Sequence, residues 1–197
     1  MLKQLTEREY MNICVFGAAS STIDQKYINA GERIGYKLAK RGHRLVFGGG
    51  KDGMMGAIAR GFRRGSGYII GIIPEFFKTE GRFEELYKDC DETIYTKDIA
   101  QRISGMEEMS DAFLALPGGG GTYEEFFKIL VSKSLDRHNK PLAVFNIEGY
   151  FDPMIRMLEY GEQENFISNN AMNNFRVFDE TQIEDFEKYA GDNKTFH

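Results

Sequence analysis

The residues best suited to chemistry lie together in one stretch, Pro117-Gly118-Gly119-Gly120-Gly121-Thr122-Tyr123-Glu124-Glu125. Four consecutive glycines expose backbone N–H groups, and a helix that begins just after them adds the partial positive charge of its N-terminus. This combination suits a phosphate group. One helical turn further on, the carboxylate of Glu125 is placed to face the sugar of a bound nucleotide.

Glu125 also has a purely structural interpretation. We expect Thr122 to be the N-cap of the helix, and Thr122-x-x-Glu125 has the spacing of a capping box, in which both side chains bind backbone N–H groups at the helix start. The spacing alone does not decide between a capping carboxylate and a catalytic one.

Two further turns are built from small residues. Gly17-Ala18-Ala19-Ser20-Ser21 and Gly48-Gly49-Gly50 each follow a short apolar run, as the Gly118–Gly121 turn does. If these runs are parallel strands, their carboxyl ends meet at one edge of the sheet, where ligands of such sheets bind. We therefore expect all three turns to line one nucleotide site.

Other nucleotide-binding motifs fit less well. Gly48-x-Gly50-x-x-Gly53 has the spacing of the dinucleotide fingerprint, with Glu75 at about the right distance beyond it. This turn follows the second predicted strand, however, and Glu75 directly follows Pro74. A dinucleotide-dependent oxidoreductase remains an alternative. A P-loop NTPase is excluded, because Lys51 is followed by Asp52 where a Walker A loop needs Ser or Thr.

The elements that must hold these turns alternate along the chain. Apolar runs predict strands, and the amphipathic stretches between them predict helices. The predicted strands are 12–16, 44–47, 68–73, 93–95, 112–116, 142–145 and 175–178, and the predicted helices are 25–41, 53–64, 99–109, 123–135, 151–162 and 181–189. Residues 75–91 are expected to be irregular apart from one helical turn near 83–87, and a polar tail follows Gly191.

This alternation predicts the class of fold. Strands that are apolar throughout and alternate with helices indicate a parallel sheet covered on both faces. Right-handed crossovers then give a doubly wound, mostly parallel sheet with helices on both faces, which is a Rossmann-like α/β fold. A length of 197 residues fits one domain. We expect a single nucleotide-binding domain over 1–197, with its core at about 12–190.

Composition limits the partners. A net charge of −5 and a pI near 5.4 argue against binding to nucleic acid or to an anionic membrane surface. No apolar run approaches the roughly 18 residues of a membrane span, and the first residues do not resemble a leader, so we expect a cytoplasmic protein. Cys14 and Cys90 form no disulfide framework. His43, His138 and His197 show no metal-ligand spacing, and neither a metal nor a cofactor is expected.

The glycine loop is similar to the hallmark of the LOG (LONELY GUY) family, the cytokinin riboside 5′-monophosphate phosphoribohydrolases, some of which carry a lysine decarboxylase label. The family pattern P-G-G-x-G-T-x-x-E matches Pro117 to Glu125 at every fixed position. Further segments resemble the family in register: Phe47–Gly50, Gly53–Gly56, Gly71–Phe76, Ser110–Leu116, His138–Pro141 and Asn146–Phe151. The resemblance covers roughly residues 12–168. No lysine stands out as an anchor for pyridoxal phosphate.

The resemblance implies an activity and a set of site residues. Members hydrolyse the N-glycosidic bond of a nucleoside 5′-monophosphate to free base and ribose 5-phosphate, and they form homodimers with the site near the interface. The family's catalytic pair maps to Glu125 and Arg102. The implied phosphate- and nucleotide-binding residues are Gly118, Gly119, Gly120, Gly121, Thr122, Gly48, Gly49, Gly50, Ser20 and Met54.

The implied pair suits the implied chemistry. Breaking a ribosyl C–N bond builds positive charge on the sugar, which a carboxylate such as Glu125 can stabilise while it orients the attacking water. Arg102 stays protonated and so cannot act as a base. Its expected role is to hold Glu125 or the phosphate by charge-assisted hydrogen bonds.

The chain departs from the family around the base and sugar. Ile99-Ala100-Gln101-Arg102-Ile103 stands where the family has M-H-E-R-K, so that only the arginine is kept, and the chain contains no tryptophan. These differences favour AMP over a prenylated cytokinin nucleotide as the expected substrate. They also leave open a carrier that binds a nucleotide or cofactor without turning it over.

Overall fold

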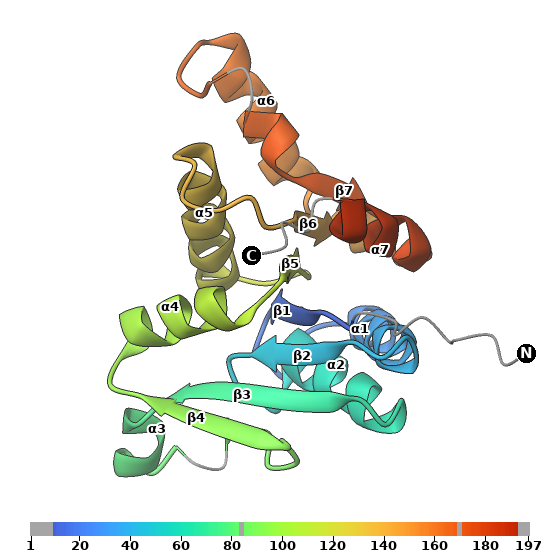
Figure 1. The fold of residues 1–197 in the computed structure, drawn as a ribbon, viewed down its shortest axis with the longest axis vertical. Coiled ribbons are helices and arrows are strands. Elements are labelled where there is room, and N and C mark those ends of the chain that lie inside the picture. The colour runs from blue at the N-terminus through green and yellow to red at the C-terminus, as the bar shows by residue number, and fades with distance from the viewer. Residues whose placement is uncertain (1–9, 83–84, 169–170, 193–197) are drawn as a thin grey trace, which may run out of the picture.

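A computed structural model describes residues 10–82, 85–168 and 171–192. Its sheet is parallel throughout, in the order β4-β3-β2-β1-β5-β6-β7 (Figure 1). The strands are β1 Asn12–Phe16, β2 Arg44–Phe47, β3 Tyr68–Pro74, β4 Glu92–Thr96, β5 Ala112–Ala115, β6 Leu142–Phe145 and β7 Arg176–Phe178. The chain builds outward from β1 to β4, then returns to the other side of β1. The strand order therefore reverses between β1 and β5.

Helices cover both faces of the sheet. They are α1 Gln25–Lys40, α2 Gly53–Arg64, α3 Phe76–Thr79, α4 Ile99–Met109, α5 Gly120–Ser134, α6 Asp152–Gln163 and α7 Ile183–Asp192, with short 3₁₀ turns η2 Ile147–Gly149 and η3 Ala171–Asn174. One core lies between the sheet and α1, α2 and α7, and the other between the sheet and α4, α5 and α6. The doubly wound Rossmann-like fold expected from the sequence is confirmed.

Strand β1 shows why this sequence makes a two-sided sheet. Its side chains alternate between the two cores: Ile13 and Val15 enter the core beneath α1 and α2, whereas Cys14 and Phe16 enter the core beneath α4 and α5. All four are buried. Burying an aliphatic or aromatic side chain contributes roughly 1.5–3 kcal/mol relative to leaving it in water, so a strand that is apolar on both faces is stable only at the centre of such a sheet.

The element boundaries lie within three residues of the expected ones, but two expectations were wrong. Helix α5 begins at Gly120 with Gly119 as its N-cap, and no side chain caps it, so Thr122 is inside the first turn and forms no capping box with Glu125. The segment after Pro74 was expected to be irregular, yet it opens with the short helix α3. Of the turn expected near 83–87, residues 83–84 lie outside the described residues, as do His197 and the end of the polar tail.

The last helix is fixed to the start of the fold by a buried histidine. Nδ1 of His43 accepts the backbone N–H of Met11, and Nε2 lies 2.8 Å from a carboxylate oxygen of Glu187 on α7. The other carboxylate oxygen of Glu187 accepts from Nε of Arg41 at 2.7 Å. His43 is thus a structural side chain.

In the part of the chain that the structure describes, no helix has the length and apolar character to cross a membrane.

Candidate active site

The three small-residue turns lie at the carboxyl edge of the sheet, next to the point where the strand order reverses between β1 and β5. The backbone N–H of Ala18, after β1, donates to the carbonyl of Pro117, after β5, at 3.1 Å. The carbonyl of Ala18 accepts the backbone N–H of Met55, in the first turn of α2, also at 3.1 Å. The turn after β1 is thereby held between the start of the Gly118–Gly121 turn and the first turn of α2. Ligands of open parallel sheets bind at this position.

The start of α2 lies unusually close to the turn after β1. Gly53 has a φ of +60°, and a Cβ atom there would lie 2.4 Å from the carbonyl oxygen of Ala18, so only glycine fits. Met54, expected among the nucleotide-binding residues, has a fully buried side chain that packs beneath Gly17 and Gly31. Its side chain supports the turn from the core. The next residue, Met55, instead faces the site.

Arg102 and Glu125 form a buried ion pair. Nη2 of Arg102 on α4 donates to Oε1 of Glu125 on α5 at 2.7 Å, and the two side chains are only 13% and 9% exposed. Nη1 of Arg102 lies over Gly48, where a Cβ atom would come within 2.9 Å of it. Nε of Arg102 is buried without a hydrogen-bond partner. A buried guanidinium with an unpaired donor is suited to an acceptor group on a ligand.

The environment of Glu125 changes its acidity. Burial raises the pKa of Glu125 to about 7, against a lowering by the Arg102 guanidinium and a further small increase from Glu124. At neutral pH the protonated and ionised forms are therefore present in comparable amounts. A carboxyl group with a pKa near the working pH is well suited to proton transfer, and such groups concentrate at catalytic sites.

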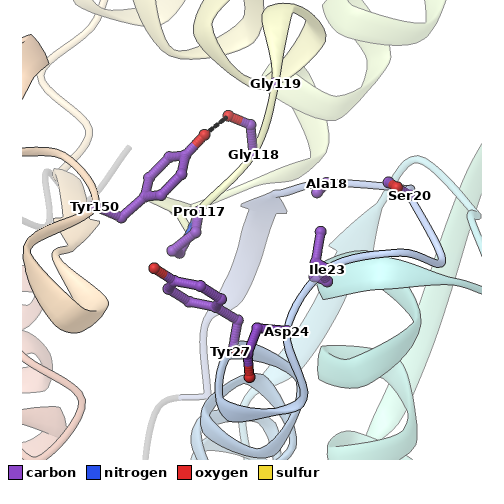
Figure 2. Close-up of a pocket in the computed structure, with 9 residues that line it drawn as sticks. All are labelled: Ala18, Ser20, Ile23, Asp24, Tyr27, Pro117, Gly118, Gly119 and Tyr150. Carbon is purple, nitrogen blue, oxygen red and sulfur yellow. Dashed lines mark hydrogen bonds between the residues drawn. The ribbon is translucent and has the colours of Figure 1, made fainter.

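Two pockets lie on either side of the Ala18–Ser20 segment. The first, here called the tyrosine pocket, has a volume of about 280 Å³ and is lined by Ser20, Tyr27, Pro117, Gly118, Gly119 and Tyr150, among others (Figure 2). The hydroxyl of Tyr150 donates to the carbonyl of Gly118 at 2.7 Å, the dashed line in Figure 2. This bond fixes the glycine loop from the β6 side.

The second, here called the arginine pocket, has a volume of about 150 Å³. It is lined by Gly48, Gly50, Met55, Phe77, Arg82 and Arg102, among others. Ala18 and Ser20 line the tyrosine pocket, and Ala19 between them lines the arginine pocket. Arg102 and the glycine loop therefore border different pockets on the same edge of the sheet.

The residues expected at the site are distributed between these features. Gly118, Gly119 and Ser20 line the tyrosine pocket, and Gly48, Gly50 and Arg102 line the arginine pocket. Gly120 and Gly121 face open space at the start of α5, since a Cβ atom at either would meet nothing within 4 Å. Thr122 is buried behind the loop against Gly118, and Gly49, with a φ of +81°, lies against Ile73.

Sequence reasoning did not single out several pocket residues. Tyr27 was noted only as one apolar position of its helix, and Tyr150 only as part of the segment after β6 that resembles the family. Phe77 and Arg82 lie in the segment expected to be irregular. The sequence does contain a hint of a ligand-site residue at Tyr150. This aromatic residue directly follows Gly149, shortly after the buried strand β6, at the edge of the sheet where ligands bind.

A parallel, doubly wound sheet with small-residue turns at its strand reversal defines a protein of the Rossmann-like class, which binds its ligands at that reversal. Comparison with known proteins narrows the class. A family model described as "Possible lysine decarboxylase" matches residues 55–184. Cytokinin riboside 5′-monophosphate phosphoribohydrolases LOG2 and LOG1 of Arabidopsis thaliana are 33% and 36% identical, and the matches span 84% of this chain and 76% of each relative. The chain therefore belongs to the LOG family.

Solved structures show the same fold at lower identity. The molybdenum cofactor binding protein from Rippkaea orientalis has a TM-score of 0.67 at 20% identity, with 91% of this chain and 96% of that one covered. The molybdenum cofactor carrier protein from Chlamydomonas reinhardtii has a TM-score of 0.65 at 19% identity, with 93% and 99% covered. At this identity the likeness extends to the fold alone.

Proposed function

We propose that this protein hydrolyses the N-glycosidic bond of a nucleoside 5′-monophosphate, AMP or a cytokinin riboside 5′-monophosphate, to free base and ribose 5-phosphate. The observation that carries the proposal is the buried Arg102–Glu125 pair, 2.7 Å apart beside the glycine loop, in a chain whose relatives bear the name of this activity. A chain of this family with a glycine loop suited to phosphate and a buried arginine–carboxylate pair beside it has the parts that this reaction needs.

The phosphate is held at the start of α5. The backbone N–H groups of Gly120, Gly121 and Thr122 belong to the first turn, where a helix leaves its donors unpaired, and no side chain caps this end. Gly120 and Gly121 leave the approach open. Ser20 lines the tyrosine pocket with Gly118 and Gly119, from the β1 side. An anion at this position also gains from the helix dipole.

Glu125 acts on the sugar and the water. As the C1′–N bond breaks, its bonding electrons leave with the base, which takes up a proton from solvent, and positive charge develops at C1′. The carboxylate of Glu125 stabilises that charge and accepts a proton from the water, whose oxygen forms the new bond to C1′. Arg102 holds the carboxylate in place through its 2.7 Å hydrogen bond and keeps donors for the substrate.

Release of free base from AMP and from N6-isopentenyl-AMP, followed by chromatography, tests this proposal. Replacing Glu125 with alanine is expected to lower kcat by at least about a hundredfold, because it removes the carboxylate that stabilises the positive charge on C1′ in the transition state and accepts the proton of the water. Glu124→Ala is the matched control, since Glu124 is the adjacent carboxylate and is exposed. Its activity should be within about twofold of wild type, the range expected of an uninvolved surface change.

Circular dichroism separates loss of catalysis from loss of folding. Glu125→Ala leaves Arg102 buried without its partner, which costs stability, so Glu125→Gln provides a second variant of the same shape. If the wild type binds nucleoside monophosphates but releases no base from any of them, the hydrolase proposal is wrong. A carrier of nucleotide or cofactor would then be the better interpretation.

We infer, from membership of the LOG family, that the protein forms homodimers. Helices α5 and α6 both pack against η3, and large apolar side chains in them and at the C-cap of α5 remain exposed: Val131, Leu135, Met157 and Tyr160. Tyr160 is 64% exposed and Leu135 is 62% exposed. A second copy of the chain would remove such apolar side chains from water.

A further inference from the structure

The position of the ion pair fixes which pocket takes the base. In a nucleoside 5′-monophosphate, C1′ joins the base on one side and carries the rest of the sugar and the phosphate on the other. With the phosphate at the start of α5 and C1′ at Glu125, the base must extend past Glu125, away from the glycine loop. Arg102 both pairs with Glu125 and lines the arginine pocket. The tyrosine pocket borders the phosphate end instead, through Gly118 and Gly119.

The arginine pocket is small for a substituted base. Its volume is about 150 Å³, half the lower end of the roughly 300–1,000 Å³ typical of pockets for drug-sized ligands. That space accommodates one planar ring system. A branched five-carbon group on the exocyclic amine of adenine would need additional volume beyond the ring, on the edge opposite the glycosidic bond.

The wall away from the sheet is a cluster of two aromatic rings and a guanidinium. The ring of Phe77 is stacked on the ring of Phe76, with centroids 4.7 Å apart. The guanidinium of Arg82 packs against both rings, 4.6 Å from the Phe77 centroid and 5.9 Å from the Phe76 centroid. Turning Phe77 out of the pocket would break its stacking and its cation–π contact, which opposes lengthening of the pocket.

Beyond Phe77 the surroundings are charged. Nε and Nη2 of Arg82 donate to the two carboxylate oxygens of Glu85 at 2.8 and 2.7 Å, and both residues line the pocket. The backbone on this side is attached to the turn after β2: Tyr87 donates its N–H to Gly49, and Lys51 donates to Glu85. An apolar substituent directed outward would meet a solvated arginine–carboxylate pair, which offers it little apolar surface to pack against.

We propose that the arginine pocket is the base-binding end of the site, and that Phe77 and the Arg82–Glu85 pair limit it to a base without a bulky exocyclic substituent. The inference rests on the proposed nucleotide hydrolase function and specifies its substrate class: a plain nucleotide such as AMP is preferred to its N6-prenylated counterpart. Phe77 is the specificity-determining residue, and it takes no part in bond cleavage.

The test compares kcat/KM for AMP and for N6-isopentenyl-AMP in the wild type and in Phe77→Ala. The wild type is expected to prefer AMP by at least about tenfold, the discrimination a pocket gives against extra methylene groups that do not fit. Phe77→Ala should reduce that ratio by about fivefold or more, through faster cleavage of the prenylated substrate. Phe166→Ala is the control, because Phe166 is an exposed phenylalanine that lines neither pocket, and its ratio should stay close to that of the wild type.

Two results would overturn the inference: equal or better cleavage of the prenylated nucleotide by the wild type, or an unchanged ratio in folded Phe77→Ala. Failure of the hydrolase proposal would look different, because neither nucleotide would release base. Calorimetric dissociation constants for the same two nucleotides then decide the matter. Tighter binding of AMP by the wild type, with the difference reduced in Phe77→Ala, supports the pocket assignment, and equal binding contradicts it.

Discussion

Two opposing effects, burial and the Arg102 guanidinium, set the pKa of Glu125. Withdrawal from water favours the protonated carboxyl, and the guanidinium of Arg102 favours the carboxylate. Because burial is the larger effect, the pKa of Glu125 is raised to about 7 from an ordinary value of 4.5. The folded protein therefore binds a proton more tightly than the unfolded chain. This stabilising contribution is complete below pH 4.5 and is lost as the pH rises through 7.

Catalysis should depend on pH in the opposite direction. If the ionised carboxylate of Glu125 accepts the proton from water, kcat/KM rises about tenfold per pH unit below 7 and levels off above it. The measurement is a pH–rate profile of base release from AMP between pH 5 and 9. The substrate phosphate also titrates, near about 6, so the profile of Glu124→Ala is recorded in parallel.

Comparison of the variants separates the enzyme's ionisation from that of the substrate, because a limb at about pH 6 that every variant shares belongs to the phosphate. Glu124→Ala should keep the limb near pH 7, whereas the residual activity of Glu125→Gln should lack it. A wild-type profile that is flat from pH 6 to 8, or a limb near pH 7 that persists in Glu125→Gln, would show that Glu125 does not act as the base.

At the scale of the elements, the site depends on the close packing of α1 on α2. The two helices approach through glycines, and a Cβ atom at Gly35 would lie 2.4 Å from the carbonyl oxygen of Ile58. This contact brings the start of α2 beneath the turn after β1, where Met55 donates its N–H to Ala18. Packing far from the ligand edge thus sets the spacing of the turns at that edge.

We expect Gly35→Ala to destabilise the fold by about 2 kcal/mol, because the added methyl group meets backbone that has to shift. Urea denaturation followed by circular dichroism measures the change. Gly105→Ala is the matched control: it is also inside a helix, and its Cβ atom would have its nearest neighbour at an ordinary 3.8 Å. It should be neutral or stabilising by up to about 1 kcal/mol, the gain in helix propensity. Equal destabilisation of both variants would contradict this account.

At the scale of the whole molecule, the exposed apolar side chains at α5 and α6 favour a dimer. We expect a dimer by size-exclusion chromatography with light scattering, and we expect Leu135→Glu to shift it toward the monomer, because a carboxylate would be buried against the partner copy. Gln25→Glu, which places the same charge on exposed α1, should leave the dimer intact. A wild-type monomer at micromolar concentration would contradict the prediction.

Much of the fold could be predicted from the sequence, because buried parallel strands are short apolar runs separated by amphipathic helices. Strands β1, β2 and β6 have the predicted bounds. The start of α5 was missed because glycines are poor helix formers. At Gly120 and Gly121 the tertiary packing of α5 outweighs this low helix propensity. Helix α3 was missed because a single turn has no periodicity to detect.

The candidate site was less predictable from the residues alone. A lone arginine in a helix resembles a solvated charge, so Arg102 was identified only through the family resemblance, and the structure then shows it paired and buried. The resemblance named Met54, yet Met55 lines the pocket, because successive helical residues point in different directions. The approach of Tyr27 to Tyr150 depends on the strand order, which no local pattern contains. Substrate, dimer and compartment stay predictions.

Helix α4 connects the edge strand β4 to the central strand β5 and packs against β1, β2, β3 and β4 on its way. It is the crossover between the two halves of the sheet, and Arg102 is carried on it. Surface connections elsewhere can gain or lose residues during evolution without moving Glu125. One residue inserted in α4 before Arg102 would turn its guanidinium by about 100° around the helix axis, away from Glu125. Among diverging relatives, the length of this single connection should therefore vary least.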